Sequence, residues 1–124
     1  MEPAFDAVCK LLKTYFDGLY YADVKRLNQV FHPRSHYVCA TRTDVILWTL
    51  PEYLYAVAQR VSPASLHAPR YDHILSIDFA GPNTALAKVS CTIQPKHFTD
   101  LLSLIKTDGQ WQIISKNFHF TIEE

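Results

Sequence analysis

Glycine is scarce in this sequence: the chain has only three, Gly18, Gly81 and Gly109, and they lie far apart. A nucleotide-binding loop needs closely spaced glycines so that the backbone can approach a phosphate group. The sequence therefore excludes a glycine-rich phosphate loop, and we predict no cofactor.

Cysteine is equally scarce. Cys9, Cys39 and Cys91 are odd in number and form no C-x-x-C pair, which excludes a disulfide framework and a zinc knuckle. We expect Cys39 and Cys91 to be buried, unpaired thiols in a reduced intracellular protein. The six histidines show none of the spacings typical of metal ligands, so the sequence predicts no metal site.

Neither sign of charge is in excess, because twelve Lys and Arg balance twelve Asp and Glu. Non-specific affinity for nucleic acid comes from clustered basic residues, so nucleic acid is excluded as the main partner. No apolar run reaches the ~18 residues of a membrane span, and no signal segment opens the chain. We therefore expect a cytoplasmic protein that has no membrane partner.

Aromatic residues, in contrast, are abundant, with seven Tyr, seven Phe and two Trp among 124 residues. They suit a lined cavity, a tight core or a hydrophobic interface, and composition alone does not choose among these. The length is enough for one ordinary domain and too short for two. We expect a single domain over residues 1–124.

Three helices are predicted in the first half of the chain, over residues 4–21, 24–31 and 50–60. The first has a wide apolar stripe at helical spacing, and Gly18 within it indicates close approach by another element. Asp23 and Thr49 are suitable N-caps for the second and third helices.

Strands dominate the rest of the chain. Two short ones are predicted at 35–41 and 44–49, and four longer ones follow the third helix, at 72–79, 84–93, 98–107 and 110–120. Asp108-Gly109 between the last two is a strong hairpin signal. Because helices and strands are segregated along the chain, the pattern predicts an α+β fold with an antiparallel or mixed sheet.

The last two strands carry apolar residues at both parities. In a strand, alternate side chains point to opposite faces, so Leu101, Ile105, Trp111 and Ile113 are predicted to lie on the outer face of the sheet. An apolar outer face needs a cover that a small monomer lacks. We therefore expect a homodimer formed through this face.

Five segments carry a resemblance over nearly the whole chain: Tyr15-Phe16-Asp17-Gly18, Ala22-Asp23, Phe31-His32-Pro33, residues 98–106 and Asp108-Gly109-Gln110-Trp111. With the order of elements, they make the chain similar to the nuclear transport factor 2-like superfamily, and within it to the group labelled "putative lumazine-binding". The resemblance implies a cone-shaped, cystatin-like α+β fold. Its strongly curved sheet would carry the three helices on the concave face.

Ketosteroid isomerase belongs to the same superfamily, and two of its functional positions have matching residue types here. The resemblance places Tyr15 at its oxyanion-binding tyrosine and Asp100 at its protonated aspartic acid. The general base falls near Cys39, which is not a carboxylate. The resemblance therefore does not imply steroid isomerisation by the same mechanism.

The candidate ligand-binding residues are those expected inside the cone, and Asp100, His32 and Tyr15 are also the catalytic candidates. His32 either points into the cone mouth or binds a backbone carbonyl at the helix end. Asp100 and Lys116 share parity with core-facing neighbours, so they either bind a polar ligand or form a structural ion pair. A further alternative is that Lys116 extends its ammonium group to the rim of the cavity. The full ligand-binding set is Tyr15, His32, Trp48, Tyr53, Phe98, Asp100, Lys116 and Phe118.

Three functions remain open at this point. The first is a protein that binds a small apolar or aromatic molecule in an aromatic-lined cavity. The second is a dehydratase-, isomerase- or cyclase-like enzyme that uses an Asp or His for proton transfer. The third is a dimeric assembly domain with a filled core and no ligand.

Overall fold

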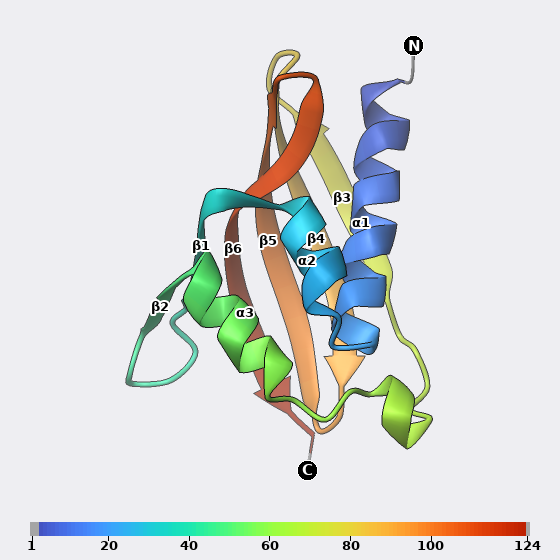
Figure 1. Ribbon diagram of the computed structural model, residues 1–124, viewed down its shortest axis with the longest axis vertical. Coiled ribbons are helices and arrows are strands. Elements are labelled where there is room, and N and C mark those ends of the chain that lie inside the picture. The colour runs from blue at the N-terminus through green and yellow to red at the C-terminus, as the bar shows by residue number, and fades with distance from the viewer. Residues whose placement is uncertain (1–2, 124) are drawn as a thin grey trace.

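The computed structural model describes residues 3–123 and shows three helices on one face of a single curved sheet (Figure 1). The helices are α1 (Ala4–Tyr20), α2 (Val24–Val30) and α3 (Leu50–Ala58), followed by the short 3-10 helix η1 (Ala64–Leu66). The strands are β1 (Phe31–Cys39), β2 (Ile46–Thr49), β3 (His73–Phe79), β4 (Thr84–Ile93), β5 (Lys96–Thr107) and β6 (Gln110–Ile122). The predicted α+β fold and the predicted order of elements are confirmed.

The six strands pair in the order β2-β1-β6-β5-β4-β3. Only β1 and β6 pair in parallel, and every other pair is antiparallel, so the sheet is mixed. The longest strands, β4 to β6, form its centre, and Asp108-Gly109 connects β5 to β6 as predicted, both residues having positive φ. The hydrophobic core lies between this sheet and the three helices.

Local signals determine where the helices begin. The Asp23 side chain accepts hydrogen bonds from the backbone of Lys25 and Arg26 at the start of α2. Thr49 and Glu52 form a reciprocal capping box at the start of α3. The second helix ends one residue earlier than predicted, at Val30, because Phe31 already has extended dihedral angles and begins β1.

Gly18 allows α1 and α2 to approach closely. A Cβ atom at this position would lie 2.7 Å from Cδ2 and 2.8 Å from Cγ of Leu27, whose side chain is fully buried. The close approach that the sequence indicated at Gly18 is therefore confirmed. It holds the C-terminal end of α1 in the place where the pocket described below begins.

One prediction about the sheet faces was wrong. A shift in the β5–β6 register places Ser103 opposite Ser115 and Leu104 opposite Ile113, so that Ile114 is an extra residue in β6. The extra residue reverses the parity, and Trp111 and Ile113 therefore lie in the core with 7% and 0% of their surface exposed. The outer-face apolar residues that remain exposed in the centre of the sheet are Leu86 and Leu101, at 41% and 40%.

Candidate functional site

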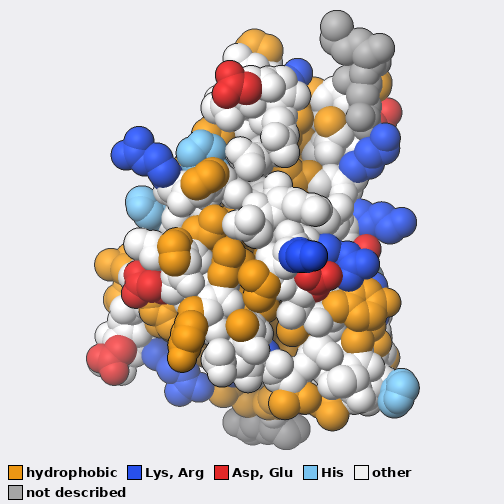
Figure 2. Space-filling model, in the orientation of Figure 1, with side chains coloured by type: hydrophobic (Ala, Val, Ile, Leu, Met, Phe, Trp, Pro, Cys, Tyr) orange, Lys and Arg blue, Asp and Glu red, His pale blue; other side chains and the backbone are white. Residues whose placement is uncertain are grey.

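A pocket of about 370 Å³ opens between the start of β2, the segment after α3 and the ends of β4, β5 and β6. The pocket lies on the side of the sheet that carries the helices. Hydrophobic side chains gather over α3 on this face of the molecule (Figure 2). The lining combines aromatic rings with cations, and its residues are Leu19, Tyr37, Ile46, Trp48, Arg60, Cys91, Ile93, Gln94, Pro95, Lys96, Phe98, Lys116, Phe118 and Phe120.

Lys116 forms the charged floor of the pocket. Only 4% of its surface is exposed, and its Nζ makes no hydrogen bond or ion pair with any residue from 3 to 123. Instead, Nζ lies 5.1–5.4 Å from the ring centres of Tyr15, Tyr37, Tyr53 and Phe118. Cation–π contacts of this kind contribute about 0.5–2 kcal/mol each, so the rings offset part of the cost of burying the ammonium group.

The ammonium group of Lys116 stays protonated. Burial by itself lowers the pKa of Lys116, but the neighbouring Tyr53 hydroxyl and Asp100 carboxylate raise it, and the net direction is upward. A lysine whose pKa is raised is a cation throughout the neutral range. Its chemical capacity is therefore to attract and stabilise negative charge, rather than to act as a nucleophile.

Tyr15 and Asp100 lie beneath the floor and not in the lining. The Tyr15 hydroxyl donates a 2.5 Å hydrogen bond to Oδ2 of Asp100, and both side chains are fully buried. Burial and the adjacent Asp100 carboxylate raise the pKa of Tyr15 well above its usual value. Oδ1 of Asp100 has no partner among the described residues, so the bond from Tyr15 is the one side-chain hydrogen bond of this carboxyl group within residues 3–123.

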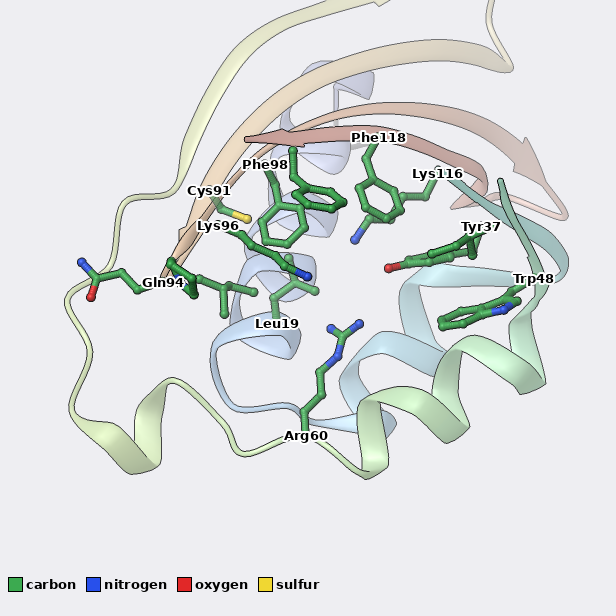
Figure 3. A pocket seen from close by; sticks show the side chains of 14 residues that line it. Leu19, Tyr37, Trp48, Arg60, Cys91, Gln94, Lys96, Phe98, Lys116 and Phe118 are labelled. Carbon is green, nitrogen blue, oxygen red and sulfur yellow. The ribbon is translucent and has the colours of Figure 1, made fainter. Parts of the chain in front are cut away.

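Polar groups from separate elements point toward the centre of the pocket together with Lys116: the Arg60 guanidinium, the Lys96 ammonium and the Tyr37 hydroxyl (Figure 3). Arg60 follows α3 and lies over the Tyr53 ring at 5.9 Å, whereas Lys96 begins β5 and lies over the Phe120 ring at 4.6 Å.

Tyr37 also forms one aromatic wall. Its ring stacks on Trp48 at 5.1 Å and on Tyr53 at 4.4 Å, with interplanar angles of 11° and 21°. Phe98 lies across the pocket from the Trp48 ring, and Phe118 lies between the two sides, 5.9 Å from Phe98 and 4.8 Å from Tyr37 (Figure 3). A small ligand in this space would have aromatic surface on two sides.

The structure brings four of the eight candidate ligand-binding residues to the pocket surface: Trp48, Phe98, Lys116 and Phe118. Tyr15, Tyr53 and Asp100 are fully buried behind it. His32 lies elsewhere, in a separate depression beside Pro33 and Ile114, where its Nδ1 accepts a hydrogen bond from the backbone N–H of Arg34. It therefore contacts a backbone amide, and neither the cone mouth nor a carbonyl.

Sequence reasoning missed Arg60, Lys96 and Tyr37 as pocket residues. Tyr37 could have been found, because it has the inward parity of Cys39 and precedes the Trp48 strand. Arg60 follows the end of a helix and Lys96 begins a strand. At such positions the spacing of apolar residues does not indicate which way a side chain points. Cys39 and Cys91 are buried and unpaired, as predicted, and burial raises the pKa of the Cys91 thiol to about 12.

Residues 3–123 contain neither a cluster of metal-ligating side chains nor a helix suited to cross a membrane. No group of three or more His, Cys, Asp or Glu side chains is placed to hold a metal ion. No helix in this part of the chain has the length and hydrophobicity required to cross a membrane.

The helices on the concave face of a mixed, curved sheet make up the same fold as solved structures described as nuclear transport factor 2-like and cystatin-like. The chain belongs to the family described as "Putative lumazine-binding", whose model matches residues 3–119. The predicted superfamily and group are thereby confirmed.

The chain is similar to solved structures of this fold and to one curated protein. A nuclear transport factor 2-like protein from Silicibacter pomeroyi is 18% identical, with a TM-score of 0.84 over 94% of this chain and 95% of its own. A ketosteroid isomerase-like protein from Erwinia carotovora atroseptica is 10% identical, with a TM-score of 0.75 over 97% and 98%. Aldolase FrzH from a Cladobotryum species is 28% identical over 120 residues, covering 93% of this chain and 90% of the aldolase.

Proposed function

We propose that this protein binds a small aromatic molecule in the pocket above Lys116. The observation that carries the proposal is Lys116, a residue that is 4% exposed and whose ammonium group lies among aromatic rings at the pocket, without a hydrogen-bond partner among residues 3–123. A buried cation without an acceptor is costly. A ligand that supplies an acceptor at this point would lower that cost.

The pocket is large enough to hold a small molecule, and the buried charge beside it distinguishes it from the other depressions of the surface. Its volume of about 370 Å³ lies within the roughly 300–1,000 Å³ of small-molecule sites. An assembly domain with a filled core needs no such space beside a buried charge. The family description, which names lumazine, is in keeping with a planar ligand between the aromatic walls.

Binding can be tested with 1-anilinonaphthalene-8-sulfonate, an aromatic dye whose fluorescence rises in an apolar site. We expect saturable binding of one dye per chain. Ile93→Trp should abolish it, because Ile93 lines the pocket and a larger ring there would fill it. Leu47→Trp is the matched control, since Leu47 is 71% exposed on β2 and does not line the pocket.

Lumazine is the first competitor to test, and its displacement of the dye would identify a planar heterocycle as a ligand. Thermal melts should show that both tryptophan variants remain folded. Absence of saturable binding, or equal binding by Ile93→Trp and the unmodified protein, would reject the proposed function.

A second candidate function is catalysis at a carbon next to a carbonyl group, and the similarity to an aldolase favours it. A cation beside a carbonyl oxygen stabilises the enolate that forms when the α-carbon loses a proton, and Lys116 would supply that charge. The described pocket lining contains no Asp, Glu or His. In this scheme a solvent water therefore accepts the proton, and the enolate carbon then forms the new bond to a second carbonyl carbon. The π bond of that carbonyl breaks, and its oxygen takes the proton back from the water to become a hydroxyl group.

The catalytic candidate can be separated from simple binding with 2-tetralone, an aromatic ketone. Catalysis predicts faster exchange of its α-hydrogens into D2O with the protein than without it, and loss of this acceleration in Lys116→Met. Because Lys116 is protonated, borohydride should trap no covalent adduct. If the exchange is not accelerated, the catalytic candidate is rejected and only the binding function remains. If borohydride traps an adduct on Lys116, a Schiff-base mechanism replaces the enolate scheme.

A further inference from the structure

Three cations line this one pocket: Arg60, Lys96 and Lys116. They come from separate parts of the chain, after α3, at the start of β5 and in the middle of β6. Figure 3 shows the nitrogen atoms of all three directed into the same space. No Asp or Glu is among the described residues that line it, so the lining carries positive charge only.

None of these cations is neutralised by a neighbour. Within residues 3–123, no ion pair or hydrogen bond involves the side chain of Arg60, Lys96 or Lys116, and each lies over an aromatic ring instead. Arg26 pairs with Asp23, and Arg70 pairs with Asp17 and Asp72, but other surface cations, such as Lys13, Lys25 and Lys88, have no ion pair among residues 3–123 either. What distinguishes Arg60, Lys96 and Lys116 is that they converge on one space lined by aromatic rings.

Three cations around one space favour a negatively charged ligand there. Charges interact more strongly where water is excluded, and Lys116 is nearly inaccessible to solvent, whereas Arg60 is exposed and Lys96 is half-buried. The nearest carboxyl group, Asp100, lies behind the floor and accepts a hydrogen bond from Tyr15. A ligand with negative charge would therefore be attracted at the floor and at the mouth together.

The walls restrict the shape of such a ligand. Tyr37 and Trp48 stack almost parallel on one side, Phe98 lies on the other, and Phe118 lies between them, 4.8 Å from the Tyr37 ring and 5.9 Å from the Phe98 ring (Figure 3). The Tyr37 hydroxyl, which bonds to no residue between 3 and 123, also points into the pocket and can donate to an anionic oxygen. Flat aromatic surface and an oxygen anion are thus recognised in the same space.

We infer that the ligand of this pocket is an aromatic anion, a planar acid that is ionised at neutral pH, with its charged oxygens at Lys116 and the Tyr37 hydroxyl. Arg60 and Lys96 hold the outer part of the ligand and attract it into the mouth. The inference rests on the proposed binding function, and it narrows the ligand from aromatic molecules in general to those with a carboxylate or a similar oxygen anion.

A matched pair of dyes tests the inference. 1-Anilinonaphthalene-8-sulfonate and N-phenyl-1-naphthylamine share the same rings, and only the first has a sulfonate. A merely apolar pocket would prefer the neutral dye, because it loses less hydration on entry. We expect the anionic dye to bind at least tenfold more tightly, which corresponds to about 1.4 kcal/mol. 2-Naphthoate should displace it at concentrations where 2-naphthamide does not.

Charge-removing variants locate the effect. Lys116→Met should remove most of the preference for the anionic dye, and the double variant Arg60→Gln with Lys96→Gln should reduce it several-fold. Lys88→Met is the matched control, since it removes one positive charge from an exposed β4 residue outside this pocket. Should Lys116→Met fail to fold, the Arg60 and Lys96 variant decides the question, because both residues lie near the mouth.

The outcomes separate the two levels of the argument. Binding of neither dye would reject the proposed function and this inference with it. Equal binding of the two dyes, or a preference that survives both the Lys116 variant and the double variant, would overturn the inference while leaving a small-molecule pocket in place. Loss of the preference in Lys88→Met to the same extent would also overturn it, because net charge alone would then explain the result.

Discussion

Tyr15 on α1 donates a 2.5 Å hydrogen bond to Asp100 on β5, across 85 residues of sequence. Both side chains are fully buried, and neither lines the pocket. The bond therefore ties the first helix to the centre of the sheet beneath the pocket floor. It also positions the Asp100 carboxylate, one of the groups that raise the pKa of Lys116 after burial has lowered it.

Tyr15→Phe should lower the free energy of unfolding by about 1–3 kcal/mol, because it leaves the buried Asp100 carboxylate without its hydrogen-bond donor. Binding of 1-anilinonaphthalene-8-sulfonate should change less than twofold. Tyr20→Phe is a suitable control, since its hydroxyl bonds the Ala68 carbonyl in a partly buried position and should cost less. Chemical denaturation and dye titration measure both quantities. Unchanged stability with clearly weakened binding would place Tyr15 in the site and contradict this role.

Gly18→Ala should destabilise the protein although Ala is the better helix former. Propensity favours Ala by about 1 kcal/mol, but the new Cβ would lie under 3 Å from two atoms of the buried Leu27 side chain. Overpacking of this kind typically costs about 1–3 kcal/mol, so we expect a net loss on urea denaturation. Gly18→Ala combined with Leu27→Ala should recover part of it. A more stable Gly18→Ala variant would show that α1 and α2 separate easily.

Cys91 should contribute to alkaline unfolding. Its pKa rises from 9.0 to about 12 in the folded protein, mainly through burial. Between these values the unfolded state binds fewer protons, so the free energy of unfolding falls as pH rises, by up to about 1.4 kcal/mol per pH unit. Below pH 9 the contribution is fully present. In Cys91→Ala the decline between pH 9 and 10 should be shallower, and curves parallel to those of the unmodified protein would refute the assignment.

We propose that the outer face of the sheet forms a homodimer interface. Leu86 and Leu101 lie on adjacent strands and are 41% and 40% exposed. Sedimentation at micromolar concentration should give a dimer, and Leu101→Asp should give a monomer, because a buried unpaired carboxylate is costly. Leu66→Asp, at a 68% exposed position of η1, should remain dimeric. A monomeric unmodified protein would reject the interface.

The sequence alone predicted the helices, the strands and the family-like architecture. Helical spacing located α1, and Asp108-Gly109 located the turn between the last two strands, because both signals act over a few residues. The inward direction of Asp100 and Phe98 followed from strand alternation along the same stretch of β5. These features are local, because each depends on residues close together in the sequence and not on which elements pack against them.

Only the tertiary structure showed on which face of the sheet Trp111 and Ile113 lie. A single extra residue at Ile114 reverses the parity of β6, and sequence alternation does not reveal such a bulge because the register is set by the partner strand. The composition of the pocket also became clear only from the tertiary structure. Arg60, Lys96 and Lys116 are 20 to 56 residues apart in the sequence, and only the packing of α3 against the curved sheet brings their charges to one space. Periodicity describes one element at a time, whereas convergence of charge depends on the placement of several elements.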